Sequence, residues 1–335
     1  MKFCQVWTTV TLIAAALFAG CRSLPIREEP PPLPAFTPTP PAPTPTPSPA
    51  PTPSPAPTPS PSPLPSYEIV LLFHSSRSGN NDIYLQDFSD SSLRRLTDHD
   101  ANDSFASWSP DRSRIAFSSD REGFPAVYVM AADGSEVARV SEEGVPAFFP
   151  AWVPDGRHLA YMSRLNGADN LKMANLDDGS SRFLTAFEEG QGGVSAFSPD
   201  GNKVIFGFER VGKYKIYQLD IATGETKEVI GNACAVSRIS WLPDGDSFLY
   251  ASSKGNQNDI WQYYFRDGRF NQITRESASD LSPSVSPDGL KAAFISQRNG
   301  DAWQLFVADL ENGSTPSACE RLTFDGHDCQ YPDWK

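Results

Sequence analysis

The sequence is poor in the residues on which most catalytic and metal sites depend. Its 335 residues include four histidines and five cysteines. They contain no Gly-x-Ser-x-Gly elbow, no His-Glu-x-x-His pair and no Cys-x-x-Cys motif. These absences favour a protein that is not an enzyme and that needs no cofactor.

Positive charge is also scarce. The chain has 28 Lys and Arg against 41 Asp and Glu, which gives a formal net charge of −13. Nucleic-acid binding relies on a basic face that neutralises phosphates. The composition therefore argues against DNA or RNA as a partner, and a protein, peptide or glycan is expected instead.

Proline is sparse except in one stretch. Twenty of the 31 prolines lie between residues 25 and 65, where Pro alternates with Thr, Ser or Ala. Proline fixes φ and has no N–H to donate, so this stretch forms neither helix nor sheet. We expect residues 21–66 to be a linker. Its proline-rich part would be a polyproline II spacer that reaches on the order of 130 Å if fully extended.

The chain begins with a short apolar run. Lys2 precedes residues 6–18, which are mostly apolar, and two small residues follow. The run is too short for a membrane span, which needs about 20 residues, so residues 1–20 are predicted to be an export signal. Residues 17–21 resemble the lipobox of bacterial lipoproteins, which implies cleavage before Cys21 and a lipid (palmitate) anchor on that residue. Soluble secretion is the alternative.

The rest of the chain repeats one short phrase. Trp-Ser-Pro-Asp at residues 108–111 returns with small changes, and its large apolar residue recurs after 44, 45, 44, 44 and 49 residues. A fixed period of this length is typical of propeller blades. The large apolar residues, which we call the blade anchors, are Trp108, Trp152, Phe197, Trp241, Val285 and Trp334.

Each repeat contains the signals of four short strands. The anchor is followed by a Pro-Asp-Gly turn, such as residues 154–156, and then by short apolar or alternating runs separated by Gly-containing turns. We therefore predict an all-β, six-bladed propeller over residues 67–335, with the anchors as packing residues between blades. The turn needs its Asp in every repeat, so these aspartates are not counted as a set of carboxylates that converge on one substrate.

The two ends of the repeat region complement each other. Residues 69–97 hold three strands but no first strand, whereas residues 331–335 hold a first strand and nothing after it. The C-terminus should complete the blade that residue 69 begins. This pairing would close the ring and leave no open sheet edge.

These repeats resemble the TolB-type propeller family. The residues that carry the resemblance are the Phe-Pro-Ala-Trp of 149–152, the Ser-Ser-Asp-Arg of 118–121, the Asp-Ile-Tyr of 82–84 and the Arg-Leu-Thr of 321–323. The resemblance implies six blades and a role in envelope protein complexes. TolB proper has a folded N-terminal domain where this chain has a predicted anchor and linker, so the resemblance extends to the propeller and not to the Tol-system role.

Three cysteines remain if Cys4 is removed with the signal and Cys21 is lipidated. Export permits a disulfide, and Cys319 and Cys329 flank the last fourth strand. A bridge between them is one hypothesis, although the loop would have to fold back because the intervening strand residues carry the chain ~13 Å away. The sequence leaves open whether Cys234 is oxidised.

The loops that precede the first strands are acidic. They would lie on one face of the propeller with the basic turns after the second strands, at Arg77, Arg121, Arg164, Arg210, Lys254 and Arg298. One hypothesis is an acidic well that attracts a basic peptide or a cation. Ca²⁺ or a transition metal would bind where the last and first loops meet. The alternative is that the basic turns neutralise the acids. The residues of this predicted face are Asp98, His99, Asp100, Asp103, Glu142, Glu143, Glu188, Glu189, Asp325, His327 and Asp328.

The sequence thus predicts a membrane-anchored propeller that faces the periplasm or the cell exterior. Its favoured function is a non-catalytic binding module, monomeric, that recognises an envelope protein, peptide or glycan through one face. A lyase or hydrolase that acts on polysaccharide at the channel mouth is the alternative. A purely structural subunit is a third.

Overall fold

The computed structural model describes residues 69–210, 212–231, 237–254, 257–298, 300, 302–310 and 319–335. The predicted signal, Cys21, the proline-rich linker and Cys234 lie outside the described residues. Within the described ranges, no helix is long and apolar enough to cross a membrane.

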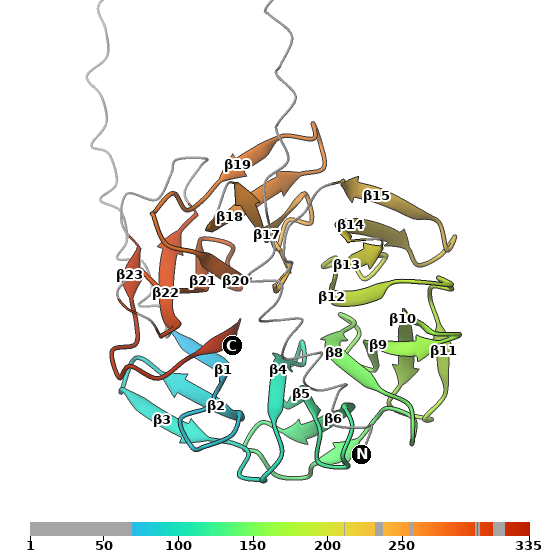
Figure 1. Ribbon diagram of the computed structural model, residues 1–335, viewed down its shortest axis with the longest axis horizontal. Helices are drawn as coiled ribbons and strands as arrows, with labels where there is room; N and C mark the ends of the chain where they lie inside the picture. Colours follow the sequence, from blue (N-terminus) through green and yellow to red (C-terminus); the bar gives the residue numbers. More distant parts are fainter. Residues whose placement is uncertain are drawn as a thin grey trace, which may run out of the picture. The chain divides into compact units, whose positions relative to one another are not determined.

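The described residues form six four-stranded antiparallel sheets arranged around a central axis (Figure 1). This arrangement confirms the predicted six-bladed all-β propeller. The strands are β1 (Val70–Ser75), β2 (Asp82–Asp87), β3 (Ser92–Arg95), β4 (Asp103–Trp108), β5 (Arg114–Ser119), β6 (Ala126–Ala131), β7 (Ala138–Arg139), β8 (Ala147–Trp152), β9 (His158–Leu165), β10 (Ala168–Asn175), β11 (Ser181–Phe183), β12 (Gln191–Phe197), β13 (Lys203–Arg210), β14 (Lys213–Asp220), β15 (Thr226–Ile230), β16 (Ser240–Trp241), β17 (Ser247–Lys254), β18 (Gln257–Tyr264), β19 (Phe270–Gln272), β20 (Asp280–Val285), β21 (Lys291–Ser296), β22 (Gln304–Asp309), β23 (Glu320–Arg321) and β24 (Gln330–Trp334).

The C-terminal strand completes the first blade. The strand order of that sheet is β24-β1-β2-β3, and β24 pairs antiparallel with β1 through Leu71 opposite Trp334 and His74 opposite Gln330. Lys335 N donates to Val70 O at 2.9 Å. The ends of the repeat region therefore pair as the sequence predicts.

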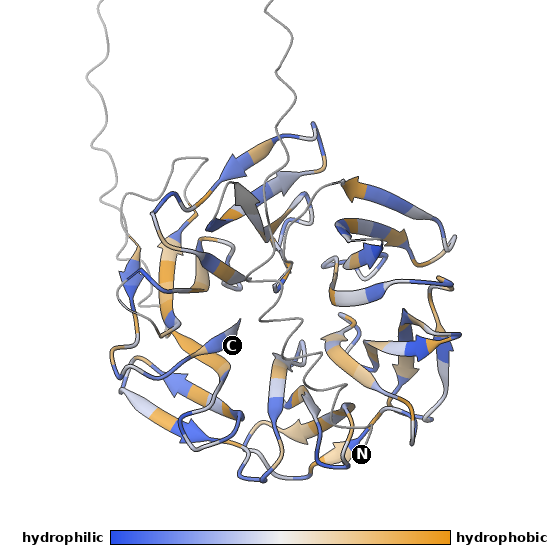
Figure 2. Cartoon of the chain, viewed as in Figure 1, coloured by the Kyte–Doolittle hydropathy of each residue, from blue (hydrophilic) through white to orange (hydrophobic). Residues whose placement is uncertain are grey.

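The hydrophobic core lies between neighbouring blades. One buried cluster joins Leu72 and Ile83 of the first blade to Ile115 and Phe117 of the second. Hydrophobic residues are concentrated on the inner and middle strands, whereas outer strands such as β3 are hydrophilic and exposed (Figure 2). Each sheet thus buries both faces of its inner strands against its neighbours.

The anchors pack where one blade meets the next. Each ends the first strand of its blade, and Trp152 is 8% exposed. Its Nε1 donates to Ser107 O of the preceding blade at 3.1 Å, and Trp241 Nε1 likewise donates to Ala196 O at 3.0 Å. The anchors therefore join blades by packing and by hydrogen bonds.

The Asp of each Pro-Asp-Gly turn bonds within its own turn. Asp200 Oδ1, for example, accepts from Asn202 N at 3.0 Å. The glycine that follows has a positive φ, 67° at Gly156, and Arg112 adopts a φ of 60° at the matching place. That conformation costs a non-glycine residue roughly 1 kcal/mol or more, so the first copy of the turn is the strained one.

The predicted bridge between Cys319 and Cys329 is wrong, because both residues are free cysteines. Cys329 is fully buried, and Arg77 Nη2 of the first blade donates to its Sγ at 3.3 Å. Cys319 instead lies beside Arg298 of the last blade. The two thiols therefore have different polar neighbours, although only ten positions separate them. Burial raises the pKa of the Cys329 thiol to about 12, so it is unreactive at neutral pH.

Candidate functional site

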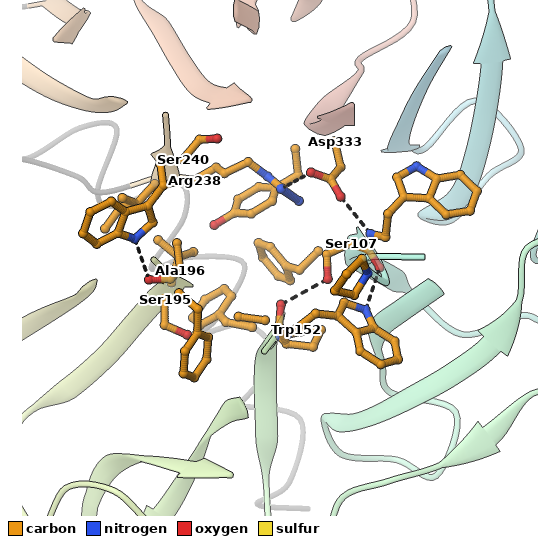
Figure 3. Close-up of a pocket in the computed structure, with 18 of the residues that line it drawn as sticks. Ser107, Trp152, Ser195, Ala196, Arg238, Ser240 and Asp333 are labelled. Carbon is orange, nitrogen blue, oxygen red and sulfur yellow. Dashed lines mark hydrogen bonds and ion pairs between the residues drawn. The ribbon is translucent and has the colours of Figure 1, made fainter. Parts of the chain in front are cut away.

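A pocket of about 350 Å³ lies at the centre of the propeller, between the first strands (Figure 3). Its walls begin at Phe105 in the middle of β4 and extend past the anchor to Pro110 in the following turn. Other first strands contribute their second halves in the same way. The pocket therefore occupies the half of the channel that is nearer to the Pro-Asp-Gly turns. Its volume is at the lower end of the range for small-ligand sites.

Two positions of the repeat form the wall of this channel pocket. The residues three places before the anchors are Phe105, Phe149, Val194, Arg238, Ser282 and Tyr331. The residues one place before the anchors are Ser107, Ala151, Ala196, Ser240, Ser284 and Asp333. All of them except Ser282 and Ser284 line the pocket.

A β-bulge turns the earlier of these positions toward the channel. In β4 the register shifts between Ser104 and Ser107, and Phe105 between them has a φ of 55°. Phe149 and Tyr331 have the same backbone conformation, with φ values of 58° and 59°. A bulge leaves one residue out of the ladder and redirects its side chain. The bulge thus places Phe105, Phe149 and Tyr331 at the channel pocket.

Three aromatic rings form the apolar base of the pocket. The Phe105 ring lies edge-on to Phe149 at 4.5 Å and to Tyr331 at 4.6 Å between centroids. Such edge-to-face contacts stabilise an aromatic cluster beyond the area that it buries. The cluster links the second and third blades to the closing strand, and it gives the pocket a rigid hydrophobic base.

One ion pair crosses the pocket. Arg238, which precedes β16, extends toward Asp333 of β24, and its Nη1 lies 2.5 Å from Asp333 Oδ1 (Figure 3). The other nitrogen, Nη2, donates to Ala106 O at 2.9 Å. The two side chains are 14% and 15% exposed. Arg238 therefore connects three blades across the axis.

Asp333 is held by three donors. Besides Arg238, Trp108 N donates to its Oδ2 at 2.8 Å and Ser284 Oγ to its Oδ1 at 3.5 Å. Burial raises the pKa of the Asp333 carboxyl, and the charge of Arg238 and these hydrogen bonds oppose that shift. The carboxylate is thus committed to contacts within the protein.

The glycines near the start of β12 are required because a neighbouring tyrosine packs against them. A Cβ on Gly193 would lie 1.8 Å from Tyr214 Oη, and one on Gly207 of β13 would lie 2.2 Å from the same atom. The Tyr214 ring of β14 thus reaches inward past two strands. Burial raises the pKa of its hydroxyl, which remains a neutral phenol.

The acidic loops occupy the opposite ends of the first strands. Asp103 begins β4, five residues before its anchor, and it is fully buried against Arg121 at 3.2 Å. Asp325 pairs with Arg77 at 3.0 Å. Glu142 pairs with Lys172. The remaining residues of this predicted face lie on the surface, with Asp328 half-buried: Asp98, His99, Asp100, Glu143, Glu188, Glu189 and His327.

The basic side chains of these turns mostly form hydrogen bonds, ring contacts and ion pairs within the propeller. Arg121 Nε donates to Ser119 Oγ at 3.0 Å, and the guanidinium lies over the Tyr128 ring at 4.6 Å. Arg298 repeats this arrangement in the last blade and pairs with the buried Asp280 at 2.8 Å. Arg210 pairs with Glu189, and Arg164 pairs with Asp169 of its own hairpin. The structure thus pairs these basic turns with acids, while the side chain of Lys254 lies outside the description.

Metal ligands do not gather on this face. Asp328 Oδ1 accepts from Trp303 N at 2.7 Å, and His99 Nδ1 accepts from Ala101 N at 3.0 Å. In the part of the chain that the structure describes, no group of three or more His, Cys, Asp or Glu could hold a metal ion. The hypothesis of a Ca²⁺ or transition-metal site therefore gains no geometric support.

Sequence reasoning missed the pair at the centre. Neither Arg238 nor Asp333 is among the predicted site residues. The available signal was their departure from the repeat. Arg238 stands where other blades have Phe, Val, Ser or Tyr, and Asp333 stands where they have Ser or Ala. A charged residue at a channel position is a functional candidate.

Comparison with known proteins identifies one family model and partial relatives. The model of the TolB beta propeller domain matches residues 54–186 and 142–334. A protein TolB homolog of Chlorobium luteolum is 32% identical over 155 residues, 46% of this chain and 34% of that protein. Dipeptidyl-peptidase 5 of Porphyromonas gingivalis is 36% identical over 108 residues, 28% of this chain and 16% of that protein. The chain spans about a third or less of the length of these curated relatives.

Solved structures show the same fold. TolB from Acinetobacter baumannii superposes with a TM-score of 0.67 at 18% identity, covering 79% of this chain and 66% of that one. Oligogalacturonate lyase from Vibrio parahaemolyticus superposes with a TM-score of 0.50 at 16% identity, covering 76% and 72%. Likeness at these identities shows the fold alone.

Proposed function

Because the chain belongs to the TolB beta propeller domain family, we propose that it is a non-catalytic binding or scaffold protein of the bacterial cell envelope. The partner would be an envelope protein, peptide or glycan held at the channel pocket. The pocket carries the proposal, since it joins an apolar base to a few oriented polar groups, as binding sites do. It also contains Arg238 and Asp333, the charged residues at the two wall positions of the repeat.

The enzyme alternative has less support from the pocket. Among the described residues, its lining contains a single carboxylate and a single guanidinium, which bind each other, and no His, Glu, Lys or Cys. A lyase or hydrolase needs a group positioned and free to move a proton. The likeness to the lyase extends to the fold, and the region shared with the peptidase is 16% of that protein.

The test is capture of partners by the full chain from detergent-solubilised envelope. Ala196→Phe puts a ring into the pocket, and it should lower the recovery of a specific partner at least tenfold. The matched control is Asp98→Asn with Asp100→Asn, at the opposite ends of the first strands, which should leave capture unchanged. Capture that resists Ala196→Phe and is lost in the control would place the working surface at the acidic loops.

We also propose that Cys21 anchors the protein to the membrane, with the proline-rich stretch as a spacer. The support is the lipobox-like sequence of residues 17–21. Several acyl chains give a stable anchor where one is marginal. Cys21→Ser should release the protein from membranes or leave it unprocessed, as seen by fractionation and gel mobility. Unchanged partition and mobility of the variant would contradict the anchor, and Cys4→Ser is the control that should change neither.

A further inference from the structure

The polar groups around the channel pocket are mostly donors. Among the described residues, Arg238 Nε, Trp108 Nε1, Ser195 Oγ and Tyr331 Oη have no hydrogen-bond partner within the protein. The guanidinium and the indole can only donate, and the two hydroxyls can donate or accept. Arg238 contributes one further N–H from each Nη, because each makes only one bond.

The charged acceptor of the pocket is already occupied. Asp333 receives hydrogen bonds from Arg238, from Trp108 N and from Ser284. The carbonyl oxygens of Ser107 and Ala196 receive the indole N–H groups of Trp152 and Trp241. A ligand that brings acceptors therefore finds partners here, whereas a ligand that brings donors competes with bonds that exist.

Two further cations lie near the central ion pair. Arg238 and Asp333 cancel each other. The charge of Arg112 also acts on Asp333, and Lys335 Nζ lies 5.5 Å from the centroid of the Trp108 ring at the edge of the pocket. The adjoining turns also carry carboxylates, since Asp111 and Asp200 follow Pro110 and Pro199 of the lining. The preference for an anion therefore rests on the unpaired donors and not on net charge.

The remaining lining is apolar. Phe105, Phe149 and Tyr331 form the base, and the exposed Pro110 and Pro199 stand at the rim beside the anchors. An apolar group of a ligand would pack on these rings while its charged group reached Arg238. Guanidinium and carboxylate match as a fork, which gives such a contact its geometry.

We propose that the channel pocket binds a peptide carboxylate next to an apolar side chain, with Arg238 as its principal donor and Tyr331 and Ser195 as auxiliary donors. A peptide that ends in an aromatic or aliphatic residue has this chemistry. The proposal rests on the proposed function, because it names the class of ligand that the binding site takes. Small rotations of Arg238 and of the two hydroxyls would bring their buried donor atoms to the ligand.

The first test compares an acid with its amide. N-acetyl-phenylalanine and N-acetyl-phenylalaninamide are titrated into the full chain in detergent, and binding is followed by the fluorescence of the tryptophans that line the pocket. The acid should bind at least tenfold more tightly than the amide, and its affinity should fall as salt rises. Equal affinities for the two probes would overturn the proposal.

Variants then test which residues bind the carboxylate of the ligand. Arg238→Gln should abolish the preference for the acid, and Arg94→Gln on the exposed strand β3 is the matched control that should retain it. Arg238→Gln leaves Asp333 without its cation and risks misfolding. Tyr331→Phe and Ser195→Ala each remove one hydroxyl. Each should therefore lower the affinity for the acid two- to fivefold and leave the affinity for the amide unchanged. A preference that survives Arg238→Gln, or that ignores both hydroxyl variants, would overturn the assignment.

A carbohydrate acid is the competing source of a carboxylate. Trigalacturonate is titrated in the same way, and it should bind more weakly than N-acetyl-phenylalanine. Tighter binding of trigalacturonate would overturn the peptide assignment. These results are separable from the proposed function: partner capture that is lost in Ala196→Phe, together with no preference for the acid, would reject the carboxylate ligand and leave the binding role intact.

Discussion

A chain that ends at Gln330 is expected to aggregate or to melt far below the full chain. The deletion removes most of β24, the strand that completes the first blade. The edge of β1 would then expose unpaired N–H and C=O groups, which promote pairing between chains. The ring would also lose the contacts that the deleted residues make between its last and first blades.

The size of the effect follows from the residues removed. Trp334 is 8% exposed within the largest hydrophobic cluster, and its backbone N donates to Ser284 Oγ at 3.1 Å. Loss of a buried aromatic costs about 3–5 kcal/mol. The deletion also removes Asp333 and leaves Arg238 as an unpaired, largely buried charge, which adds to the cost. Net stabilities are roughly 5–15 kcal/mol, so the loss is a large share of the total.

Thermal unfolding of the two chains measures this effect, with solubility as a second readout. Deletion of Lys335 alone is the control, because it keeps Trp334 and Asp333, and it should lower the melting temperature only slightly. A chain that ends at Gln330 and melts like the full chain would show that β24 does not close the propeller.

Acid should weaken the fold through His74. This histidine of β1 is 3% exposed, and its ring lies 5.6 Å from Phe105 and 6.2 Å from Tyr331. Phe105 N lies 3.5 Å from its Nδ1, in a direction that suits the neutral ring as acceptor. Burial lowers the pKa of His74 from 6.5 to about 4, although a hydrogen bond with Gln330 opposes the shift.

The direction of the pH effect follows from proton linkage. Between pH 6.5 and 4 the unfolded chain binds a proton at His74 that the folded chain does not bind. The free energy of unfolding therefore falls as the pH falls through this window, and the contribution is complete above pH 6.5. A shift of this size corresponds to about 3 kcal/mol.

Urea unfolding at pH 7.5 and at pH 4.5 should reveal the contribution. Wild type should lose about 2–3 kcal/mol more than His74→Gln between these pH values. Carboxylates also titrate in this range, but both proteins share them, so the difference isolates His74. His327→Gln, at an exposed histidine, should lose as much as wild type. The same pH dependence in wild type and His74→Gln would reject the mechanism.

The repeat itself predicted most of the fold. The spacing of the anchors, the Pro-Asp-Gly turns and the alternating runs are local patterns, and each is determined by residues near in sequence. That is why the six blades and the role of Trp152 and Trp241 as packing residues follow from the sequence alone. The complementary ends of the repeat region predicted β24 on the same basis, since a missing first strand and a surplus one are visible in the sequence.

Charge pairing could not be derived in this way. The sequence showed acidic loops and basic turns on one face. Only the structure showed that Arg121 and Arg298 stack on aromatic rings and hold buried aspartates within their blades. The direction of a side chain depends on bulges and on rotamers, which composition does not report. The disulfide failed for the same reason, because the Cys319 thiol lies beside Arg298 whereas the Cys329 thiol accepts from Arg77.

The amino-acid sequence alone determined that this protein is a six-bladed propeller preceded by a proline-rich stretch, because periodic hydrophobic burial and turn chemistry are properties of neighbouring residues. Only the tertiary structure decided where its pocket lies. Arg238 and Asp333 are 95 positions apart, and closure of the ring brings the strand that carries Asp333 opposite Arg238. An ion pair across a channel axis depends on the geometry of the whole ring, and no local pattern encodes it.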